Sequence, residues 1–400
     1  MFILKKKGVE NMYKGFKVKI YPNEEQQELL FQFFGSARFA YNWVIGLEEE
    51  NYKNGGKFIT KTQLTKLWKV KKKELLWAKK ISGRAFRSGI FNAVESYERF
   101  FKGLSGYPKF KTKRNSRLSC GTHEQNTLIE HNRIKFEKLG WVKCHNNIPC
   151  TWSVHPNGRS MTDKTLCNPI ISYDGVDFWF SVSIEVSDCQ LDKNIDVTDA
   201  IGIDLGIKKL ATDSSMIDCI KPNIKKDKKK LKRLQRRASR YYEKRLLESK
   251  TTKTKMSDIP KSKNLLKLER EINKVHKRIA NKLDTNIHEY TTRLVKSNPK
   301  AIVIEDLNVK GMMKNKHLSE KVKEAKFYEF RRQLEYKCKW NNVPLIIADR
   351  WFPSSKLCNC CGHKKQKLSL SERVYICEEC GYKEDRDYNA SLNLRDLAYN

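Results

Sequence analysis

Two cysteine pairs constrain the fold of the C-terminal part of the chain more than any other feature of the sequence. Each has the form Cys-x-x-Cys-Gly, the first being Cys358 and Cys361 and the second Cys377 and Cys380. This spacing is close to that of sites in which four thiolates hold one zinc ion. Each glycine allows the left-handed turn that aims backbone N–H groups at the sulfurs. The spacing predicts a structural zinc site, because four thiolates complete the tetrahedron and leave no position for a reactive water.

Two alternatives to this ligand set stay open at this point. Cys360 lies beside Cys361 and could replace it, although only by forming a shorter Cys-x-Cys loop, so we expect Cys361 to be the ligand. The four cysteines could also be structural or redox-active without a metal. The glycine after each pair and the spacing favour zinc.

The chain is strongly basic. Its 400 residues include 81 Lys and Arg against 46 Asp and Glu, a formal net charge of +35. This exceeds what solubility requires and indicates a polyanionic partner, of which nucleic acid is the leading candidate and an anionic membrane the competing one. No segment approaches the roughly eighteen consecutive apolar residues that cross a bilayer, and no polybasic run follows a lipidation signal. We therefore expect no membrane partner.

The N-terminus and the remaining cysteines bear on location. Met1–Leu4 runs directly into three lysines, which leaves no apolar core for a signal peptide. Of the twelve cysteines, seven lie outside the zinc module without the spacing of a disulfide framework, as expected of reduced thiols. These features predict a cytoplasmic protein.

The length of the chain predicts two to four domains, and the first of them is helical. Residues 14–21 alternate like a strand, after which Asn23 and Gln26 form the capping-box pattern of a helix start. Separate helices are expected at about 37–50 and 83–102, where aromatic residues recur at helical spacing. Because their outer faces carry Lys and Arg, these segments predict a basic helical bundle.

Most of residues 117–190 has the short, turn-bounded apolar runs of a β-domain. The clearest strand is DFWFSVSIEV, in which apolar and polar residues alternate. A small antiparallel barrel is expected, with the strand at 14–21 belonging to it and the helical bundle inserted between.

From residue 199 onwards the pattern changes to α/β. Short buried strands are expected in AIGIDLGIKKLATDS, at 301–304 and in VPLIIADR, with a helix at about 325–341. Between the first two strands, two apolar stripes predict a hairpin of two long helices. Residues 221–245 of this hairpin carry thirteen Lys or Arg and two acids, so they repel one another unless phosphate neutralises them.

Three acidic residues follow a common pattern in this region. Asp204 lies in the first strand, Glu305 ends a later strand, and Asp387 begins a helix just after the cysteine module. One acid at the end of a strand often only caps the next helix, but three in one domain of a basic protein indicate a shared site. Such a set can hold two Mg²⁺ ions about 4 Å apart, as in metal-dependent phosphodiester cleavage.

Several motifs together resemble one known family. GIDLGIKKLAT, IVIEDLNVKGM and the block from SSKLCNCCG through CEECG to DRDYNASLNL are similar to the split RuvC nuclease core, with its inserted zinc ribbon, of TnpB, the RNA-guided nucleases encoded by bacterial insertion sequences. YKGFKVKIYPNEEQQELLFQFFGSARFAYNWVI resembles the N-terminal segment of that family, and GYPKFKTKR its basic loop. The resemblance therefore covers nearly the whole chain.

The resemblance implies a multidomain α/β fold that includes a β-barrel. The implied domains are a wedge β-barrel at 1–22 and 106–198, a helical recognition domain at 23–105, an RNase H-like (RuvC) nuclease domain at 199–357 and 381–400, and a zinc ribbon at 358–380 inserted in the nuclease domain. It also implies that Asp204, Glu305 and Asp387 are catalytic ligands of magnesium and that Cys358, Cys361, Cys377 and Cys380 bind zinc.

The activity implied is cleavage of DNA directed by a structured guide RNA. Base pairing would supply sequence discrimination, while the protein reads backbone shape and a short flanking motif on double-stranded target DNA, acting as a monomer with its RNA. A compact type V CRISPR effector has the same motifs and stays an alternative. An RNA-guided repressor that has lost a carboxylate is less favoured because all three positions are acidic. A transposase in the strict sense is disfavoured because nothing identifies a recombinase tyrosine.

Overall fold

The computed structural model describes residues 12–113, 116–145, 148, 152–154, 160–162, 166–186, 198–369 and 371–399. The chain divides into two compact units, Met1–Asp188 and Cys189–Asn400. The segment Met1–Leu4, on which the signal-peptide argument rests, lies outside the described residues. Within them, none of the helices combines the length and the apolar character needed to cross a lipid bilayer.

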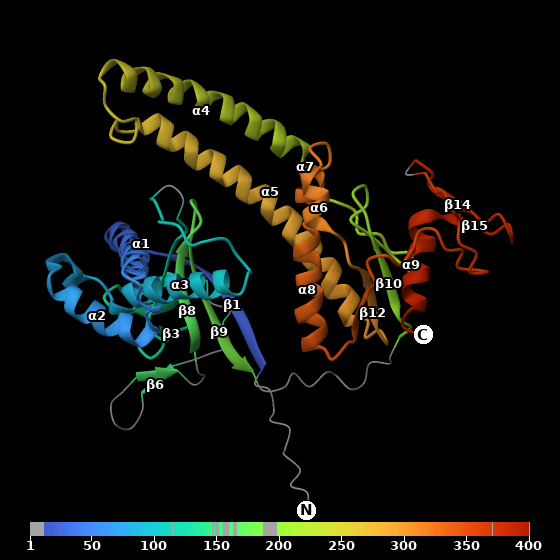
Figure 1. The fold of residues 1–400 in the computed structure, drawn as a ribbon, viewed down its shortest axis with the longest axis horizontal. Coiled ribbons are helices and arrows are strands. Elements are labelled where there is room, and N and C mark those ends of the chain that lie inside the picture. Colours follow the sequence, from blue (N-terminus) through green and yellow to red (C-terminus); the bar gives the residue numbers. More distant parts are fainter. Residues whose placement is uncertain are drawn as a thin grey trace, which may run out of the picture. The chain divides into compact units, whose positions relative to one another are not determined.

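The first unit contains an antiparallel sheet with the strand order β2-β8-β9-β1-β5-β4-β3. Figure 1 labels β8, β9, β1 and β3 of this sheet. Its strands are β1 (Met12–Tyr21), β2 (Leu118–Gly121), β3 (Leu128–Ile129), β4 (Arg133–Phe136), β5 (Gly140–Cys144), β8 (Leu166–Tyr173) and β9 (Phe178–Val186), while β6 (Trp152–Val154) and β7 (Ser160–Thr162) pair with each other. β1 pairs with β9 from Met12 opposite Val186 to Ile20 opposite Phe178, so the N-terminal strand does join the later strands. The strand pairs of the described residues leave β2 and β3 at opposite ends, and a closed barrel is not shown.

The helices of the first unit pack against one another and against β2 of this sheet. They are α1 (Glu24–Lys53), α2 (Lys61–Lys73), the 3₁₀ helix η1 (Leu76–Lys80) and α3 (Gly83–Phe101). The predicted capping box is confirmed, since Asn23 Oδ1 accepts from the Gln26 backbone N–H at 2.8 Å and Gln26 Oε1 accepts from the Asn23 N–H at 3.1 Å. The separate helix expected at 37–50 was wrong, because α1 runs on unbroken and Ser36 Oγ bonds the carbonyl of Gln32 within the helix.

The second unit is built on a sheet with the order β11-β10-β12-β13. Its strands are β10 (Ile201–Leu205), β11 (Ala211–Asp213), β12 (Ile302–Glu305) and β13 (Leu345–Ala348), and a separate hairpin is formed by β14 (Val374–Ile376) and β15 (Lys383–Asp385). β10, β12 and β13 are parallel, and β11 is antiparallel to β10. The isoleucines of β10 and β12 are buried in the core of this unit, as expected of strands covered on both faces.

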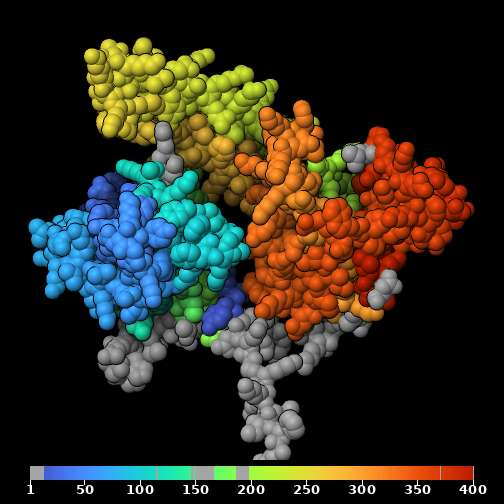
Figure 2. All heavy atoms as spheres, viewed as in Figure 1, coloured from blue at the N-terminus to red at the C-terminus, as the bar shows by residue number. Residues whose placement is uncertain are grey.

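Helices surround this sheet and extend from it. They are α4 (Lys225–Thr251), α5 (Lys263–Lys296), α6 (Val309–Lys314), α7 (Ser319–Ala325), α8 (Phe327–Trp340) and α9 (Arg386–Asp396). The predicted hairpin of two long helices is confirmed: α4 and α5 share a small core of their own, and its yellow end stands out from the orange and red parts of the same unit (Figure 2). The other end of α5 packs on α8 and the sheet.

A glycine brings the last helix of the chain onto the first strand of this unit. A Cβ atom at Gly202 would lie 2.0 Å from the carbonyl oxygen of Ser391 and 2.3 Å from the backbone nitrogen of Arg395, both in α9. A larger residue at this position would force the helix away from β10. This close approach positions the N-terminus of α9 beside the end of β10, where Asp204 lies.

Candidate active site and zinc centre

The structure brings together the three carboxylates singled out in the sequence. Asp204 is in β10 and Glu305 is the last residue of the neighbouring parallel strand β12, one position beyond the pair Ile203–Ile304. Asp387 is in the first turn of α9, which packs on β10. Adjacent elements of one unit therefore direct three acids that are distant in sequence to the same place.

The electrostatics of this site are those of negative charges held close together away from water. Burial raises the pKa of Asp204 well above its usual range, and the charges of Glu305 and then Asp387 raise it further. Burial also raises the pKa of Glu305, which shares a hydrogen bond with Asp204. Neighbouring acids of this kind cannot all ionise cheaply without a compensating cation. The site therefore has the charge and the oxygen donors that suit hard divalent ions.

The neighbouring acid Asp306 has a different environment. It forms ion pairs with Arg331, at 2.9 Å, and with Arg350. The bond to Arg350 is the main cause that lowers the pKa of Asp306. Glu305 instead accepts a hydrogen bond of 2.6 Å from the hydroxyl of Ser354, and this bond leaves its remaining oxygen lone pairs available for a metal ion. Of these two consecutive acids, Glu305 is the one with capacity for a ligand role.

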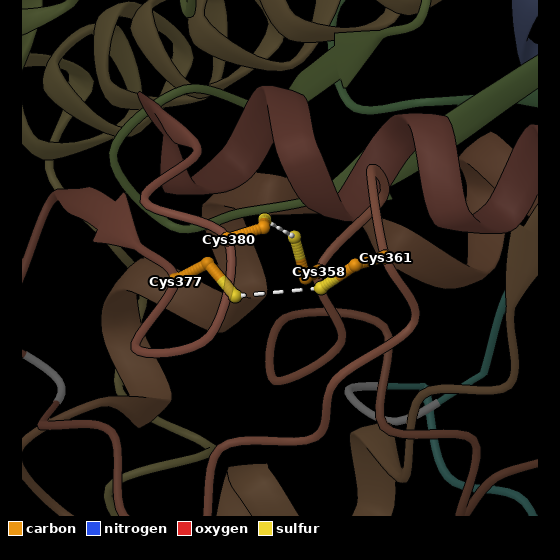
Figure 3. A group of neighbouring side chains, drawn as sticks. All are labelled: Cys358, Cys361, Cys377 and Cys380. Carbon is orange, nitrogen blue, oxygen red and sulfur yellow. Dashed lines mark hydrogen bonds between the residues drawn. The ribbon is translucent and has the colours of Figure 1, made fainter.

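The four predicted cysteines form a compact cluster (Figure 3). The sulfurs of Cys358 and Cys380 are 3.6 Å apart, those of Cys361 and Cys377 are also 3.6 Å apart, and all four lie within 4.8 Å of one another. Zinc–sulfur bonds of about 2.3 Å in a tetrahedron separate the sulfurs by about 3.8 Å. Cys360 is exposed and is not part of this cluster. The donor set and spacing thus fit a structural zinc ion.

The backbone around the cysteines has the conformation that a zinc knuckle requires. The glycines that follow the two pairs, Gly362 and Gly381, have φ values of 74° and 69°. These left-handed turns cost a glycine little and would strain most other residues. The backbone N–H of Cys380, together with that of Glu379, lowers the pKa of Cys377 to about 6. These two N–H groups thus favour the thiolate form of Cys377.

Two buried asparagines connect α9 to the segment that enters the first cysteine pair. Asn389 Nδ2 donates to the carbonyl of Leu357 at 2.7 Å, and its Oδ1 accepts from the backbone N–H of Asn359 at 3.1 Å. Asn393 Nδ2 donates to the carbonyls of Ser354 and Leu357, both at 2.8 Å. We call Asn389 and Asn393 with these partners the asparagine clasp.

The clasp was not found in the sequence, where its only signal is two amides four residues apart on a short helix. It connects the cysteine cluster with the carboxylate site. The helix that carries the clasp also carries Asp387, and the segment that it holds runs from Ser354, the partner of Glu305, to Cys358. A shift of the cysteine module would therefore be transmitted to two of the three carboxylates.

Comparisons with known proteins identify the family. Residues 180–316 match the family described as "Probable transposase" (OrfB_IS605), residues 327–394 match the "Cas12f1-like, TNB domain", and residues 12–57 match a "Helix-turn-helix domain" of the same OrfB type. In the structure, residues 12–57 consist mainly of strand β1 and the single helix α1.

Similar proteins and structures extend over nearly the whole chain. A protein of Streptomyces pristinaespiralis named "Putative RNA-guided DNA endonuclease" is 32% identical over 396 residues, covering 96% of this chain and 89% of that protein. The Escherichia coli (strain K12) protein of the same name, InsQ, is 27% identical, covering 95% of this chain and 91% of that protein. The solved structure described as "Cryo-EM structure of the Cas12f1-sgRNA-target DNA complex" aligns with a TM-score of 0.57 and 13% identity, over 96% of this chain and 99% of that one, so the mixed α/β multidomain fold is similar to that of Cas12f1. The resemblance predicted from the motifs is confirmed, and the chain belongs to the TnpB (OrfB) family of RNA-guided DNA endonucleases.

Proposed function

We propose that this protein cleaves double-stranded DNA selected by a bound guide RNA, with Asp204, Glu305 and Asp387 as its catalytic metal ligands. The observation that carries this proposal is the convergence of these three acids from β10, β12 and α9, with burial and mutual repulsion raising the pKa of Asp204. Family membership supplies the reaction class. Perturbed acids in a site of this kind are typical of catalysis.

The three carboxylates would hold Mg²⁺, which suits oxygen donors. When bound, a pair of such ions activates a water molecule and stabilises the leaving 3′ oxygen of the cut strand. Ser354 holds one oxygen of Glu305 by its 2.6 Å hydrogen bond, which fixes the rotation of that carboxylate. Arg373 lies 3.8 Å from Asp387 and can pair with that acid or with a phosphate of the substrate. Ser354 and Arg373 therefore orient the carboxylates of Glu305 and Asp387 and do not take part in the bond cleavage themselves.

Zn²⁺ would be held by Cys358, Cys361, Cys377 and Cys380. Its role is structural, because a four-thiolate site has no open position. Binding would fix the two knuckles and, through the asparagine clasp, the position of α9. The zinc module in this proposal delivers Asp387 to the other two acids.

The proposed partners are a structured guide RNA and a target duplex with a short flanking motif, with one protein molecule acting with its RNA. The similar Cas12f1 structure is a complex with an sgRNA and a target DNA, and this supports both partners. The outward face of α4 offers matching charge. Its exposed cations recur on one side of the helix, namely Lys225, Lys229, Arg233, Arg236, Arg240 and Lys244. Phosphate contacts of such residues supply sequence-independent affinity.

The finer division into domains is also part of this proposal. The sheet of the first unit would belong to a wedge barrel at 1–22 and 106–198, with the helices at 23–105 forming the recognition domain. The sheet β11-β10-β12-β13 supports an RNase H-like nuclease domain at 199–357 and 381–400 that contains the zinc ribbon at 358–380.

A compact type V CRISPR effector is the second candidate. It is favoured by the match of residues 327–394 to the Cas12f1-like TNB domain. The insertion-sequence assignment is preferred because the relatives named as RNA-guided endonucleases align over 95% or more of this chain, whereas a Cas12f1 of Sulfoacidibacillus thermotolerans aligns over 31%.

The test of this proposal uses the protein purified with the RNA that it acquires at its native locus. Sequencing the bound RNA gives the guide, and a matching duplex with a randomised flank is then offered with Mg²⁺. We expect the wild type to cut both strands and Asp204→Ala to bind the same duplex without cutting it. Undiminished cutting by Asp204→Ala would remove the mechanism, and absence of a bound RNA would remove the guided activity.

A further inference from the structure

A pocket of about 420 Å³ opens beside the carboxylate site. Glu305 lines it on one side, and Ala348, Phe352 and Leu394 supply apolar surface. The volume lies at the lower end of the range of small-ligand sites, about 300–1,000 Å³. Asp306 and Asp349 line the pocket as well, so it combines polar groups with an apolar wall that can receive a planar group of the substrate next to the proposed catalytic carboxylate.

Trp351 lines the same pocket and is 85% exposed, the largest exposed fraction among the large apolar side chains of the described residues. Among the residues that the structure describes, its indole has no hydrogen-bond partner and no aromatic ring partner. The backbone of this loop is nevertheless ordered by hydrogen bonds. The backbone N–H of Trp351 donates to Asp349 Oδ1 at 2.8 Å, and the backbone N–H of Phe352 donates to the Asp349 carbonyl at 3.0 Å. An exposed indole on a fixed loop leaves a face free for stacking.

Charged side chains of both signs line this pocket, namely the acids Glu305, Asp306 and Asp349 and the bases Arg350, Lys356 and Lys364. Lys356 and Lys364 line it, and Lys364 is exposed and has no acidic partner among the described residues. Arg350, which also lines the pocket, is held by Asp306. Lys356 Nζ donates to the carbonyl of Gln366 at 3.1 Å, so Lys364 is the lysine of this pocket that is open to a phosphate. An aromatic ring beside such a lysine is chemistry that binds single-stranded nucleic acid, in which bases stack on rings and phosphates contact cations.

We propose that this Trp351 pocket binds one nucleotide of the DNA strand being cut, next to the scissile phosphate, with its base stacked on Trp351 and its phosphate near Lys364. This inference rests on the proposed function, because it takes Glu305 as part of the cleavage site. Every base has a stacking face, so the pocket acts on any target sequence. Its effect is to hold the strand in position while the adjacent phosphate is cleaved.

The experiment is a double-mutant cycle between the protein and the DNA, carried out with the complete protein–RNA complex. Single-turnover cleavage is measured for the wild type, Trp351→Ala and Trp351→Phe on matched duplexes that carry a single abasic nucleotide at successive positions around the cut. Tyr328→Ala is the control, because Tyr328 is 73% exposed in α8 and does not line the pocket. Target binding is measured in parallel for each protein.

We expect Trp351→Ala to slow cleavage of the intact duplex by about 5- to 160-fold, the range that corresponds to loss of one base–aromatic stack. Trp351→Phe keeps a ring and should stay within about fivefold of the wild type, while Tyr328→Ala should match it. At one position, the abasic nucleotide should slow the wild type by the same factor and leave Trp351→Ala unchanged.

If Trp351→Ala and the abasic nucleotide slowed cleavage by independent factors at every position of the abasic nucleotide, the pocket assignment would be overturned. That result differs from a failure of the proposed function, in which the wild type would not cut the intact duplex or Asp204→Ala would cut it. Equal slowing by Trp351→Ala and Tyr328→Ala would likewise count against a specific stack, because it would reflect a general loss of exposed aromatic surface.

Discussion

Asn393 and Ser354 connect the last helix of the protein to the carboxylate site. The amide of Asn393 donates to the Ser354 carbonyl at 2.8 Å, and the hydroxyl of Ser354 donates to Glu305 at 2.6 Å. Both Asn393 and Ser354 are buried. The orientation of Glu305 is thereby tied to α9, the helix that carries Asp387.

We predict that Asn393→Ala lowers both stability and cleavage. It leaves the carbonyls of Ser354 and Leu357 without this donor, at a cost of about 1–3 kcal/mol in the free energy of unfolding. Asn341→Ala is the matched control, because the Asn341 amide also bonds a backbone carbonyl, that of Lys337 at 2.7 Å, but lies at the end of α8. Denaturant melts and single-turnover rates should show a loss of stability in both and a loss of cleavage only in Asn393→Ala. Equal rates in the two variants at matched stability would contradict a positioning role.

The zinc centre gives a prediction with an internal control. Cys377→Ser should abolish zinc binding, loosen residues 381–399 and eliminate cleavage, because Asp387 follows the second knuckle directly. Cys360→Ser should retain zinc and activity, since Cys360 lies outside the four-sulfur cluster. Metal analysis, limited proteolysis and a cleavage assay measure these outcomes. Full activity in a protein shown to be free of zinc would refute the link between the module and the site.

Removing the charge of Asp204 and removing the charge of Asp306 should have different effects on the stability of the folded protein. The raised pKa of Asp204 means that the folded state holds a proton more tightly than the unfolded chain, so this group costs stability as pH rises above its ordinary pKa of 3.8. The lowered pKa of Asp306 means that its ionised form stabilises the fold, and this contribution is lost as pH falls through its folded pKa.

At neutral pH without divalent ions, Asp204→Asn should therefore raise the melting temperature, by about 2–4 °C if the gain is about 1 kcal/mol. Asp306→Asn should leave the melting temperature unchanged or lower it. Added Mg²⁺ should stabilise the wild type and Asp306→Asn but not Asp204→Asn. Calorimetry with and without Mg²⁺ tests this, and a destabilised Asp204→Asn would argue against repulsion in the site.

A buried lysine between α5 and α8 predicts a stability change at alkaline pH. Lys337 Nζ donates to the His288 carbonyl at 2.9 Å and to the hydroxyls of Thr291 and Thr292 at 2.6 and 2.8 Å. Burial lowers the pKa of Lys337 to about 8, against the opposing effects of the Glu329 charge and then Cys338. The unfolded chain then binds a proton that the folded protein releases between about pH 8 and 10.5, so stability from this group rises over that window.

We expect the free energy of unfolding of the wild type to rise with pH across this window relative to that of Lys337→Met. Lys323→Met, which changes an exposed lysine of α7, should follow the wild-type profile. Denaturant titrations at several pH values give the comparison. Parallel profiles for the wild type and Lys337→Met would show that this amine is not responsible for any change.

The parts of the site that could be predicted from the sequence are those that short sequence patterns determine. β10 and β12 are short apolar runs with Asp204 and Glu305 at or near their ends, and parallel strands place such ends at one edge of a sheet. The cysteine spacing is likewise local, because the two residues between the thiols of each pair fix the knuckle. These features depend little on what packs against them.

Features set by tertiary packing were missed. The Gly35–Ser36 pair indicates a break between helices, yet α1 continues because both of its halves pack their apolar faces in one core. α2 has only Leu64 and Trp68 buried, so its apolar stripe was too narrow to notice, although Thr60 and Gln63 form a capping box. The asparagine clasp depends on a helix meeting a distant loop, and no short pattern encodes that.

The contact of Gly202 with α9 also affects the order in which parts of the second unit can fold during protein synthesis. A strand near the beginning of the second unit receives its covering helix from near the end of the chain, so this pairing is of high contact order. During synthesis, β10 emerges long before the residues that complete its surroundings. Until residues 386–396 have emerged, the growing polypeptide carries only two of the three acids, so the proposed metal site cannot assemble before α9 is made.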